Sequence, residues 1–260
     1  MWAALKELYR YRDLLLGLAI RDVKVRYRQT LLGVLWAVLQ PLAFMAIFTL
    51  IFARFGKISS DGAPYPVFSY AGLLPWTFFA TTLTLSVGSI GNHISMVKKI
   101  YFPREVFPLS VTLACLVDFG IAFALFIGLA LLFHVPVSGN WVWLLWPLAI
   151  EIMWIVGLGL LTSAANVFFR DIKYIVPVAI QLGIFASPVI YSVTAIPAHL
   201  QPWYFLNPMA VVIDGFRQVV LHGALPVTHH LWIGTAIAGA CLVASYAFFK
   251  RVEVKFADLI

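Results

Sequence analysis

The chain has 260 residues, of which 62% are hydrophobic and only 11% are charged, and its mean hydropathy is +0.94. Soluble domains carry about 25% charged residues, so this composition excludes a soluble globular protein and indicates an integral membrane protein. The formal charge of +7 is not gathered in a basic, water-exposed domain, which excludes a nucleic-acid-binding protein.

The first predicted element is an amphipathic helix over residues 1–30. Its polar positions recur every three or four residues and so share one helical face: Lys6, Arg10, Asp13, Gly17, Arg21, Lys24 and Arg28. The opposite side is apolar, although Arg12 and Arg26 interrupt it. Such a helix would lie in the headgroup plane of the cytoplasmic leaflet and lead directly into the first span.

Stretches without charge predict six transmembrane helices, because about 20 apolar residues are needed to cross the hydrocarbon core. In chain order they cover residues 31–53, 67–91, 107–133, 142–168, 174–194 and 230–249. The predicted fold class is therefore an all-α membrane protein, with 1–260 as a single transmembrane domain. Spans one to five fall within 31–194, the sixth within 229–250, and a cytoplasmic tail covers 251–260.

Lysine and arginine indicate the orientation of these spans. If both termini are cytoplasmic, fifteen of the 18 basic residues lie on the inner side, and only Arg54, Lys57 and Arg217 lie outside. The cytoplasmic flanks of membrane proteins carry such an excess of positive charge. We therefore expect a multi-pass protein with both termini in the cytoplasm.

Residues 195–228 are expected to form a helical hairpin on the outer side, between spans five and six. Asn207 can cap a helix with Pro208 at its first position, and Gly223 is a suitable stop. A helix between them would be about 22 Å long, which is too short to cross the membrane. A seventh crossing would also place the C-terminal basic residues outside. The hairpin is therefore predicted to be re-entrant or interfacial.

The sequence contains no recognisable catalytic unit. It lacks a Gly-rich phosphate loop ending in Lys-Ser/Thr, a His-Glu-x-x-His pair and a Cys-x-x-Cys motif. We therefore predict no catalytic residue, no metal site and no cofactor in this chain. His229 and His230 are better explained as an interfacial pair than as half a metal site, which needs three or four converging ligands.

Two carboxylates, Asp118 and Glu151, lie within predicted spans. Because burying a charge in the membrane is costly, each is a candidate for a proton relay, a substrate contact or a helix-packing lock. The simpler alternatives are that Asp118 bonds a neighbouring helix and that Glu151 reaches outer water. Asp214 and Arg217, three residues apart on the hairpin helix, would also lie at membrane depth.

Aromatic residues gather near the predicted outer interface. The tryptophans within 141–146 fit an interfacial belt, whereas Trp203, Tyr204 and Phe205 open the hairpin and fit either a belt or a surface on which sugars stack. On the cytoplasmic side, residues 95–109 mix charged and apolar side chains. Such a loop fits either a docking surface for a soluble partner or an interfacial helix on lipid.

Four segments resemble the membrane subunit of bacterial ABC exporters for lipid-linked polysaccharides, which export O antigens, some capsules and teichoic acids. They are RYRQTLLGVLWAVLQPL (26–42), KKIYFPREVFPLS (98–110), NVFFRDIKYI (166–175) and YFLNPMAVVIDGFRQ (204–218). The resemblance extends over essentially the whole chain. It implies a homodimer in the bacterial inner membrane, paired with two copies of a separate subunit that binds ATP and Mg²⁺. The chain itself would be a transport subunit and not an enzyme.

The resemblance also implies roles for particular residues. The ATPase-facing surface would contain Lys98, Lys99, Tyr101, Phe102, Arg104, Glu105, Arg170 and Asp171. The outer gate would contain Trp203, Tyr204, Phe205, Asn207, Asp214 and Arg217. The cargo would be a polysaccharide on undecaprenyl diphosphate, with O antigen the first candidate, moved to the periplasmic side during lipopolysaccharide biosynthesis. Its diphosphate would meet a basic entrance formed by Arg21, Lys24, Arg26 and Arg28.

Two other function classes fit the sequence less well. A secondary transporter driven by protons or ions would show internal repeats and broken helices near the membrane midplane. An integral membrane glycosyltransferase of cell-envelope glycan synthesis would gather carboxylates at one membrane face, whereas the carboxylates of this chain are scattered.

Overall fold

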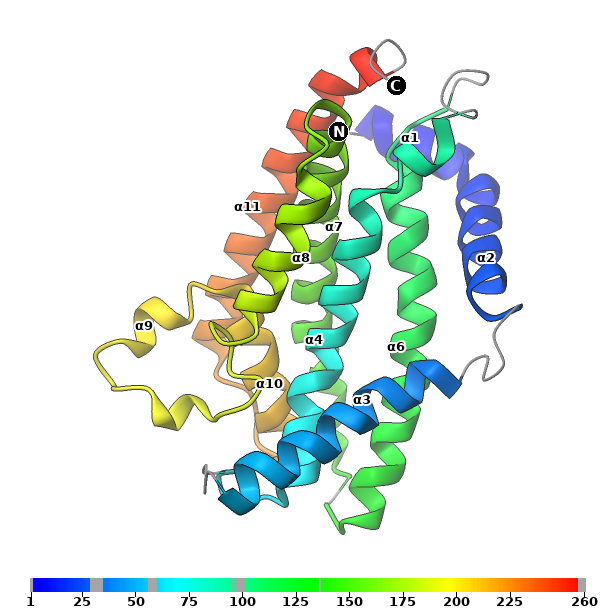
Figure 1. The fold of residues 1–260 in the computed structure, drawn as a ribbon. Coiled ribbons are helices and arrows are strands. Elements are labelled where there is room, and N and C mark those ends of the chain that lie inside the picture. The colour runs from blue at the N-terminus through cyan, green and yellow to red at the C-terminus, as the bar shows by residue number, and fades with distance from the viewer. Residues whose placement is uncertain are drawn as a thin grey trace.

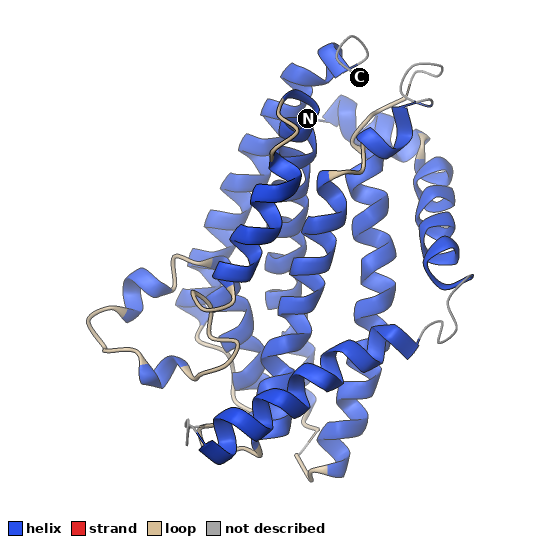
Figure 2. Cartoon of the chain, viewed as in Figure 1, coloured by secondary structure: helices blue, strands red, loops and turns tan. Residues whose placement is uncertain are grey.

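The computed structural model describes residues 2–28, 35–55, 60–94, 96, 102–135 and 137–256. None of these residues forms a strand, and helices make up most of the structure (Figure 1, Figure 2). The predicted all-α class is therefore confirmed. The start of the first helix and the end of the last lie at the same end of the bundle, which we name the terminal end (Figure 1).

The centre of the bundle consists of four helices: α4 (Tyr65–Val87), α6 (Val106–Leu132), α7 (Leu145–Phe168) and α11 (Thr228–Val252). Most side chains of α4 are buried. The backbones of α7 and α11 approach closely at Gly157, where a Cβ atom would lie 3.1 Å from the backbone of Leu242. Small residues permit such close contacts between helices in membranes.

Among the described residues, three helices are long and apolar enough to cross a membrane: Val106–Leu132, Gly139–Phe168 and Thr228–Lys255. They agree within a few residues with the predicted spans 107–133, 142–168 and 230–249. The second includes the 3-10 turn η3 (Gly139–Leu144), and the third includes η5 (Glu253–Lys255). Two apolar helices are shorter, Val38–Phe52 and Ile172–Gly183. The total of six crossings stays a prediction.

The first predicted span, 31–53, corresponds to α3 (Leu35–Phe48) and the π-helical segment η1 (Thr49–Phe55); residues 31–34 lie outside the described part of the chain. α3 crosses α4 and α6 obliquely and contacts both (Figure 1). Pro41 lies inside α3, where it removes one backbone donor from the helix. The oblique crossing leaves room for the cavity described below.

The predicted fifth span, 174–194, is wrong in its length. α8 (Ile172–Gly183) has 12 residues, which extend over about 18 Å. The chain then turns through residues 184–192 and the 3-10 turn η4 (Val193–Ala195). Pro188 disfavours a helical conformation for the residue before it. The apolar composition continues past the end of α8, so hydropathy alone predicted a longer helix.

The N-terminal helix predicted over residues 1–30 is two helices, α1 (Trp2–Arg10) and α2 (Arg12–Arg28), which meet at Tyr11. α2 runs beside α6 (Figure 1) and does not lie across the end of the bundle. The prediction of a single helix is therefore wrong, because the chain turns at Tyr11, whereas its location in the headgroup plane stays a prediction. The connection between α2 and α3, residues 29–34, lies outside the described residues.

The buried side of α2 is narrower than the predicted apolar face. Leu18 and Ala19 are buried, whereas Leu16 and Ile20 are about half exposed in this chain (50% and 53%). Arg26, which seemed to interrupt the apolar side, points at α6 because Asp118 is its partner there. The charged residue on the otherwise apolar side of α2 is thus explained by its polar contact with α6.

The predicted ends of the hairpin helix are confirmed. After the short α9 (Gln201–Tyr204), α10 covers Pro208–His222, and the Asn207 side chain accepts a hydrogen bond from the Met209 amide at 3.0 Å. Gly223 ends the helix in the left-handed conformation, with φ +59°. Most side chains of α10 are buried against α4, α7 and α11. The hairpin helix is therefore part of the core, and its re-entrance into the membrane stays a prediction.

Two apolar cores stabilise the bundle. The larger one joins α4, α6, α7 and α10. The smaller one lies at the terminal end, and we name it the terminal cluster: Leu18, Ile90, Phe102, Val106, Phe107, Leu160, Ala164, Phe249 and Phe256. It joins α2, the start of α6, α7 and the end of α11, so four segments far apart in the sequence are packed together at this end.

Candidate functional site

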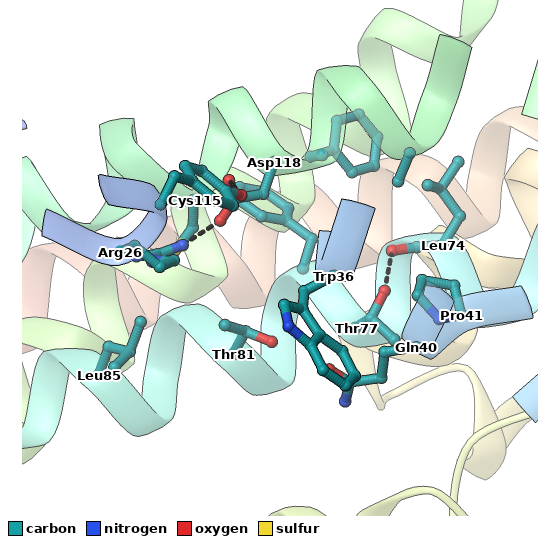
Figure 3. A pocket seen from close by; sticks show the side chains of 14 residues that line it. Arg26, Trp36, Gln40, Pro41, Leu74, Thr77, Thr81, Leu85, Cys115 and Asp118 are labelled. Atoms are coloured by element: carbon teal, nitrogen blue, oxygen red, sulfur yellow. Dashed lines mark hydrogen bonds and ion pairs between the residues drawn. The ribbon is translucent and has the colours of Figure 1, made fainter. Parts of the chain in front are cut away.

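A cavity lies beside α3, between this helix and the pair α4 and α6, and we name it the lateral cavity. Its volume is about 440 Å³. Side chains from α2, α3, α4 and α6 surround it (Figure 3). Its lining consists of Arg26, Tyr27, Trp36, Gln40, Pro41, Leu74, Thr77, Phe78, Thr81, Leu85, Cys115, Asp118, Phe119 and Ala122. The cavity therefore combines apolar walls with one charged group at the α2–α6 contact.

That charged group is the ion pair between Arg26 and Asp118 (Figure 3). The Tyr27 hydroxyl donates a second hydrogen bond to Asp118, and Arg26 also lies 3.7 Å from Cys115 Sγ. The side chains of Arg26 and Asp118 are 29% and 20% exposed. Of the interpretations of Asp118 offered by the sequence, the bond to a neighbouring helix is the one that the structure shows.

The four predicted entrance residues have different surroundings. Arg26 is paired as described, and Arg21 pairs with Asp22 at 2.9 Å and contacts His93. Lys24 and Arg28 are exposed at the end of α2. The structure therefore does not gather the four cations into one cluster, and two of them already have protein partners.

The predicted ATPase-facing loop is only partly described, because Lys98, Lys99 and Tyr101 lie outside the described residues. Phe102 is buried in the terminal cluster with its ring 5.3 Å from that of Phe107. The Phe102 ring therefore packs inside this chain, and the role of the loop in contacting an ATPase stays a prediction.

Arg104 and Glu105 also face the interior of the chain. Glu105 is 2% exposed and accepts a hydrogen bond from Lys250 Nζ at 2.9 Å. Lys250 donates to Glu253 as well, at 3.0 Å. Arg104 donates to the backbone carbonyl of Glu253, and its guanidinium lies 5.9 Å from the ring of Phe256. These contacts fasten the start of α6 to the end of α11, a role that the sequence did not indicate.

The connection between α7 and α8 is exposed at the same end of the bundle. Arg170 and Asp171, both predicted coupling residues, are exposed, as are their neighbours Phe169 and Tyr174 (69% and 65%). Large aromatic rings next to charges on an exposed surface are typical of binding sites for other proteins. Phe169 and Tyr174 are candidates that the sequence analysis missed, although they stand within the NVFFRDIKYI segment.

Arg217 fixes the hairpin to the bundle. It is 5% exposed and donates to the backbone carbonyls of Phe68, Pro188, Val189 and Tyr191. Its guanidinium also lies 3.6 Å from the centroid of the Phe68 ring, in a cation–π contact. The five donors of a guanidinium suit such a set of acceptors, which a lysine could not satisfy.

Gly72 of α4 makes room for this contact. A Cβ atom at position 72 would lie 2.6 Å from Arg217 Nη2 and 2.9 Å from the Val189 carbonyl oxygen. Only glycine therefore permits α4, Arg217 and the chain after α8 to meet here. The sequence alone gave no sign of this requirement, because the three segments are far apart along it.

A second cavity lies between the hairpin and the turn before α4, and we name it the hairpin pocket. Its volume is about 440 Å³. It is lined by Asp61, Ser192, Val193, Thr194, Gln201, Phe205, Asp214, Arg217, Gln218, His222 and His230. Of the predicted gate residues, Phe205, Asp214 and Arg217 therefore share one cavity.

The remaining gate residues are not part of this lining. Trp203 is 73% exposed, and the Tyr204 hydroxyl lies 2.9 Å from that of Tyr191. The Asn207 amide donates to the Ala186 carbonyl at 3.1 Å and so fixes the chain after α8 to the start of α10. Asp61 was not predicted; its φ of +52°, in an Asp-Gly turn, places it at the pocket.

The surroundings of Glu151 differ from the simplest prediction, which was that its carboxylate reaches outer water. It is fully buried in α7, and neither carboxylate oxygen has a hydrogen-bond partner among the described residues. Glu151 therefore does not reach outer water within this chain, and that prediction is wrong. The reason is that α7 is covered at this level by its neighbours, which hydropathy along one helix does not reveal.

Comparison with known proteins identifies a family and several relatives. Residues 14–221 match the family described as ABC-2 type transporter. The chain is 30% identical to the O-antigen export system permease protein RfbA of Myxococcus xanthus, over 98% of each chain. A relative of the same name from Klebsiella pneumoniae is 30% identical over 95% of each chain. The polysialic acid transport protein KpsM of Escherichia coli is 26% identical over 80% of this chain and 81% of its own.

The family match covers most of the chain, and the first relative covers almost all of it. The resemblance found from four sequence segments is therefore confirmed. The chain belongs to the ABC-2 type transporter family of membrane proteins.

Proposed function

We propose that this chain is the permease subunit of an ABC exporter for a cell-surface polysaccharide, with O antigen as its cargo. The observation that carries the proposal is the 30% identity to two O-antigen export permeases over at least 95% of both chains. A capsular polysaccharide is the second candidate, favoured by the relative named for polysialic acid transport. The higher identity and coverage favour O antigen.

The proposal includes a homodimer of this chain with two copies of a separate ATP-binding subunit in the inner membrane. The family match and the lack of a phosphate-binding loop in this sequence support a separate ATPase. The excess of basic residues on one side supports cytoplasmic termini. The shared position of the first and last helices at the terminal end agrees with that orientation (Figure 1).

The proposed route begins at the basic end of α2. The cargo is a polysaccharide on undecaprenyl diphosphate, whose phosphates bind cationic side chains through charge-assisted hydrogen bonds. Lys24 and Arg28 are exposed and can bind the phosphates, and Arg21 lies nearby. Arg26 instead forms an ion pair with Asp118. The lateral cavity adjoins this end of α2. The hairpin then serves as the gate through which the glycan leaves on the periplasmic side.

The proposed contact with the ATPase is the exposed connection between α7 and α8, together with the loop before α6. Arg170 and Asp171 are exposed there, between Phe169 and Tyr174. ATP-driven movement of the partner would reach the bundle as rigid-body motion of packed helices. The terminal cluster is the part of this chain through which such motion would pass to α2, α6 and α11.

Deletion and complementation in the host bacterium test the proposal. A strain without this chain should lose surface O antigen and accumulate lipid-linked polymer in the cytoplasm, and a plasmid copy should restore export. Inactivating ATP hydrolysis in the partner subunit should give the same phenotype. Normal surface polymer in the deletion strain would overturn the proposed function.

A further inference from the structure

We infer that Glu151 is a proton-binding site that makes opening of the hairpin depend on the pH of the outer solution. Its carboxyl is neutral while the hairpin helix is packed against α7, and it loses its proton when water enters on opening. The inference rests on the proposed function for the role of the hairpin as a gate. The neutral carboxyl itself is argued from the packing of this chain alone.

The carboxyl of Glu151 is enclosed by protein. The residue is 0% exposed, and neither of its oxygens has a hydrogen-bond partner in the described part of the chain. It lines neither the lateral cavity nor the hairpin pocket, so these cavities do not bring water or a counter-ion to it. In the described ranges, no three His, Cys, Asp or Glu side chains converge as metal ligands.

The titratable groups on the helices packed against α7 do not pair with this carboxyl. They are Asp214, Arg217 and His222 of α10, Tyr65 and Tyr70 of α4, Cys115 and Asp118 of α6, Lys173 and Tyr174 of α8, and His229, His230, Cys241, Tyr246, Lys250 and Arg251 of α11. Arg217 donates to four backbone carbonyls, and Lys250 binds Glu105 and Glu253 at the terminal end. An ionised Glu151 would therefore have no counter-charge among the described residues.

The hairpin helix covers the side of α7 that carries Glu151. A Cβ atom at Gly215 of α10 would lie 3.4 Å from Cγ of Pro147. Pro147 and Glu151 are four residues apart on α7 and therefore share one face of it. Both residues are buried. Movement of α10 away from α7 would thus open a path for water to the carboxyl.

Burial without a partner favours the neutral form of this group. A lone carboxylate in an apolar interior is so costly that the group binds a proton instead. Even the neutral carboxyl leaves its O–H donor and its carbonyl acceptor unpaired here, a cost that an apolar side chain of the same size would avoid. Ionisable residues within membrane spans are functional candidates for this reason. The open state, in which water can hydrate the carboxyl, is where its polarity has a use.

Opening and closing then exchange one proton with the outer solution. On opening, the O–H bond of the carboxyl breaks, the proton passes to water, and a hydrated carboxylate remains. On closing, the carboxylate takes a proton back from the same solution. A full cycle therefore transports no net proton, and ATP remains the energy source. Because only the closed state holds the proton, acid favours closing and alkali favours opening.

Infrared spectroscopy of the purified chain in detergent tests the neutral carboxyl. A neutral carboxyl has a carbonyl stretching band that a carboxylate lacks. This band should be present at neutral pH in the original chain and missing in Glu151→Gln and in Glu151→Met, which removes every polar atom of the side chain. Glu105→Gln is the matched control, because Glu105 is also buried, at 2% exposure, but is paired with Lys250. Its substitution should remove carboxylate bands only.

Two further measurements test the link to the hairpin. In Gly72→Ala, whose hairpin attachment is loosened, the neutral-carboxyl band should be lost at a lower pH than in the original chain, whereas Gly120→Ala should keep it. In lipid vesicles with ATPase partner, polymer transfer should be severalfold faster into an alkaline lumen than into an acidic one. Glu151→Gln should lose most of this dependence.

Each result has an opposite that would overturn the inference. An unchanged neutral-carboxyl band in both Glu151 variants would show that this carboxyl is ionised. Equal titration of the band in Gly72→Ala and Gly120→Ala, or an unchanged pH dependence of transfer in Glu151→Gln, would overturn the link to the hairpin.

The spectra also separate this inference from the proposed function, because they need no transport. If deleting the chain leaves surface polymer unchanged, the proposed function fails whatever the spectra show. If deletion abolishes export but the band does not depend on Glu151, only the proton-binding site fails.

Discussion

Arg26 and Asp118 show how a single polar contact explains two irregularities in the sequence. Arg26 breaks the apolar side of the N-terminal helix, and Asp118 lies within a predicted span, but the sequence alone did not show which residue pairs with either one. In the structure each is the partner of the other, and Tyr27 adds a hydrogen bond to Asp118. A charge in a membrane protein is tolerated when it is paired in this way.

Asp118→Asn should therefore destabilise the protein. The substitution keeps the shape of the side chain but leaves the Arg26 guanidinium without its counter-charge. Hydrogen bonds to charged groups contribute about 1.5–3 kcal/mol, and solvent screening of this partly exposed pair reduces that value, so we expect a loss of about 1–2 kcal/mol in the free energy of unfolding. Denaturant unfolding of the purified protein in detergent measures it.

Asp13→Asn is the matched control, because the Asp13 side chain is 90% exposed, and it should unfold as the unmodified protein does. Exchanging the pair, with Arg26→Asp and Asp118→Arg together, should recover part of the lost stability. An Asp118→Asn variant as stable as the original chain would show that the pair contributes nothing.

Lys24 and Arg28 have a different predicted effect, because they are exposed and do not stabilise the fold through a partner seen in the structure. Each basic residue near an anionic surface contributes about 1 kcal/mol to attraction. The double variant Lys24→Ala, Arg28→Ala should export polymer severalfold more slowly, with unchanged membrane insertion and unfolding. Lys255→Ala, another exposed cation, serves as the control. Unchanged export by the double variant would remove the entrance assignment.

At the level of elements, the hairpin depends on a match between α4 and α10. Arg217 of α10 donates to carbonyl groups of α4 and of the chain after α8, and Gly72 provides the space. The turn that follows α8 is thereby fixed to both helices. The gate proposed above would need such a fixed attachment, because a loosely attached hairpin could not exclude solutes.

Gly72→Ala should loosen this attachment. The added Cβ atom would lie 2.6 Å from Arg217 Nη2, and overpacking of this kind costs about 1–3 kcal/mol. We expect faster proteolysis within residues 184–200 and reduced export. Gly120→Ala is the control, since a Cβ there meets nothing within 4 Å. The account of the gate is wrong if both alanine variants resist protease equally and export normally.

The end of α11 is joined to the start of α6 by side-chain contacts whose role can be tested. Lys250 binds Glu105 and Glu253, and Arg104 binds the Glu253 carbonyl, so the start of α6 moves with the end of α11. Motion imposed on the loop before α6 by an ATPase would therefore reach α11 directly. We therefore predict that Lys250 is a positioning residue for the proposed coupling to the ATPase.

Lys250→Met should leave Glu105, which is 2% exposed, without its cation. Breaking a buried pair costs about 3 kcal/mol at the lower end of the measured range, and solvent screening of the partly exposed Lys250 reduces this value. We expect the purified complex to hydrolyse ATP while exporting less polymer per ATP. Arg251→Met, at the exposed adjacent position, should leave this ratio unchanged, and Glu105→Lys with Lys250→Glu should restore part of it. An unchanged ratio in Lys250→Met would rule out this role.

Over the whole molecule, local sequence patterns predicted the positions and ends of single helices. Hydropathy located α6, α7 and α11, and the Asn207, Pro208 and Gly223 signals located both ends of α10. Patterns along one segment could not show that Arg26 meets Asp118 or that Glu105 meets Lys250, because these partners are 92 and 145 residues apart. The end of α8 was missed because apolar residues continue into the following turns.

The same limit applies to the candidate sites. The hairpin was predicted as a gate, but the hairpin pocket needs Asp61 from before α4 and His230 from α11, which only the fold brings together. The loop before α6 was predicted to face a partner, yet Phe102 and Glu105 are buried. The exposed candidates are instead Phe169, Arg170, Asp171 and Tyr174.

Reconstitution of the purified permease with its ATPase partner in lipid vesicles tests the central claim most directly. The measured quantity is the transfer of radiolabelled lipid-linked polysaccharide from the ATP side to the opposite leaflet. The account predicts transfer that requires ATP, that stops when the partner cannot hydrolyse it, and that leaves the polymer length unchanged. Transfer driven by a proton gradient without ATP, or elongation of the polymer in place of its transfer, would contradict it.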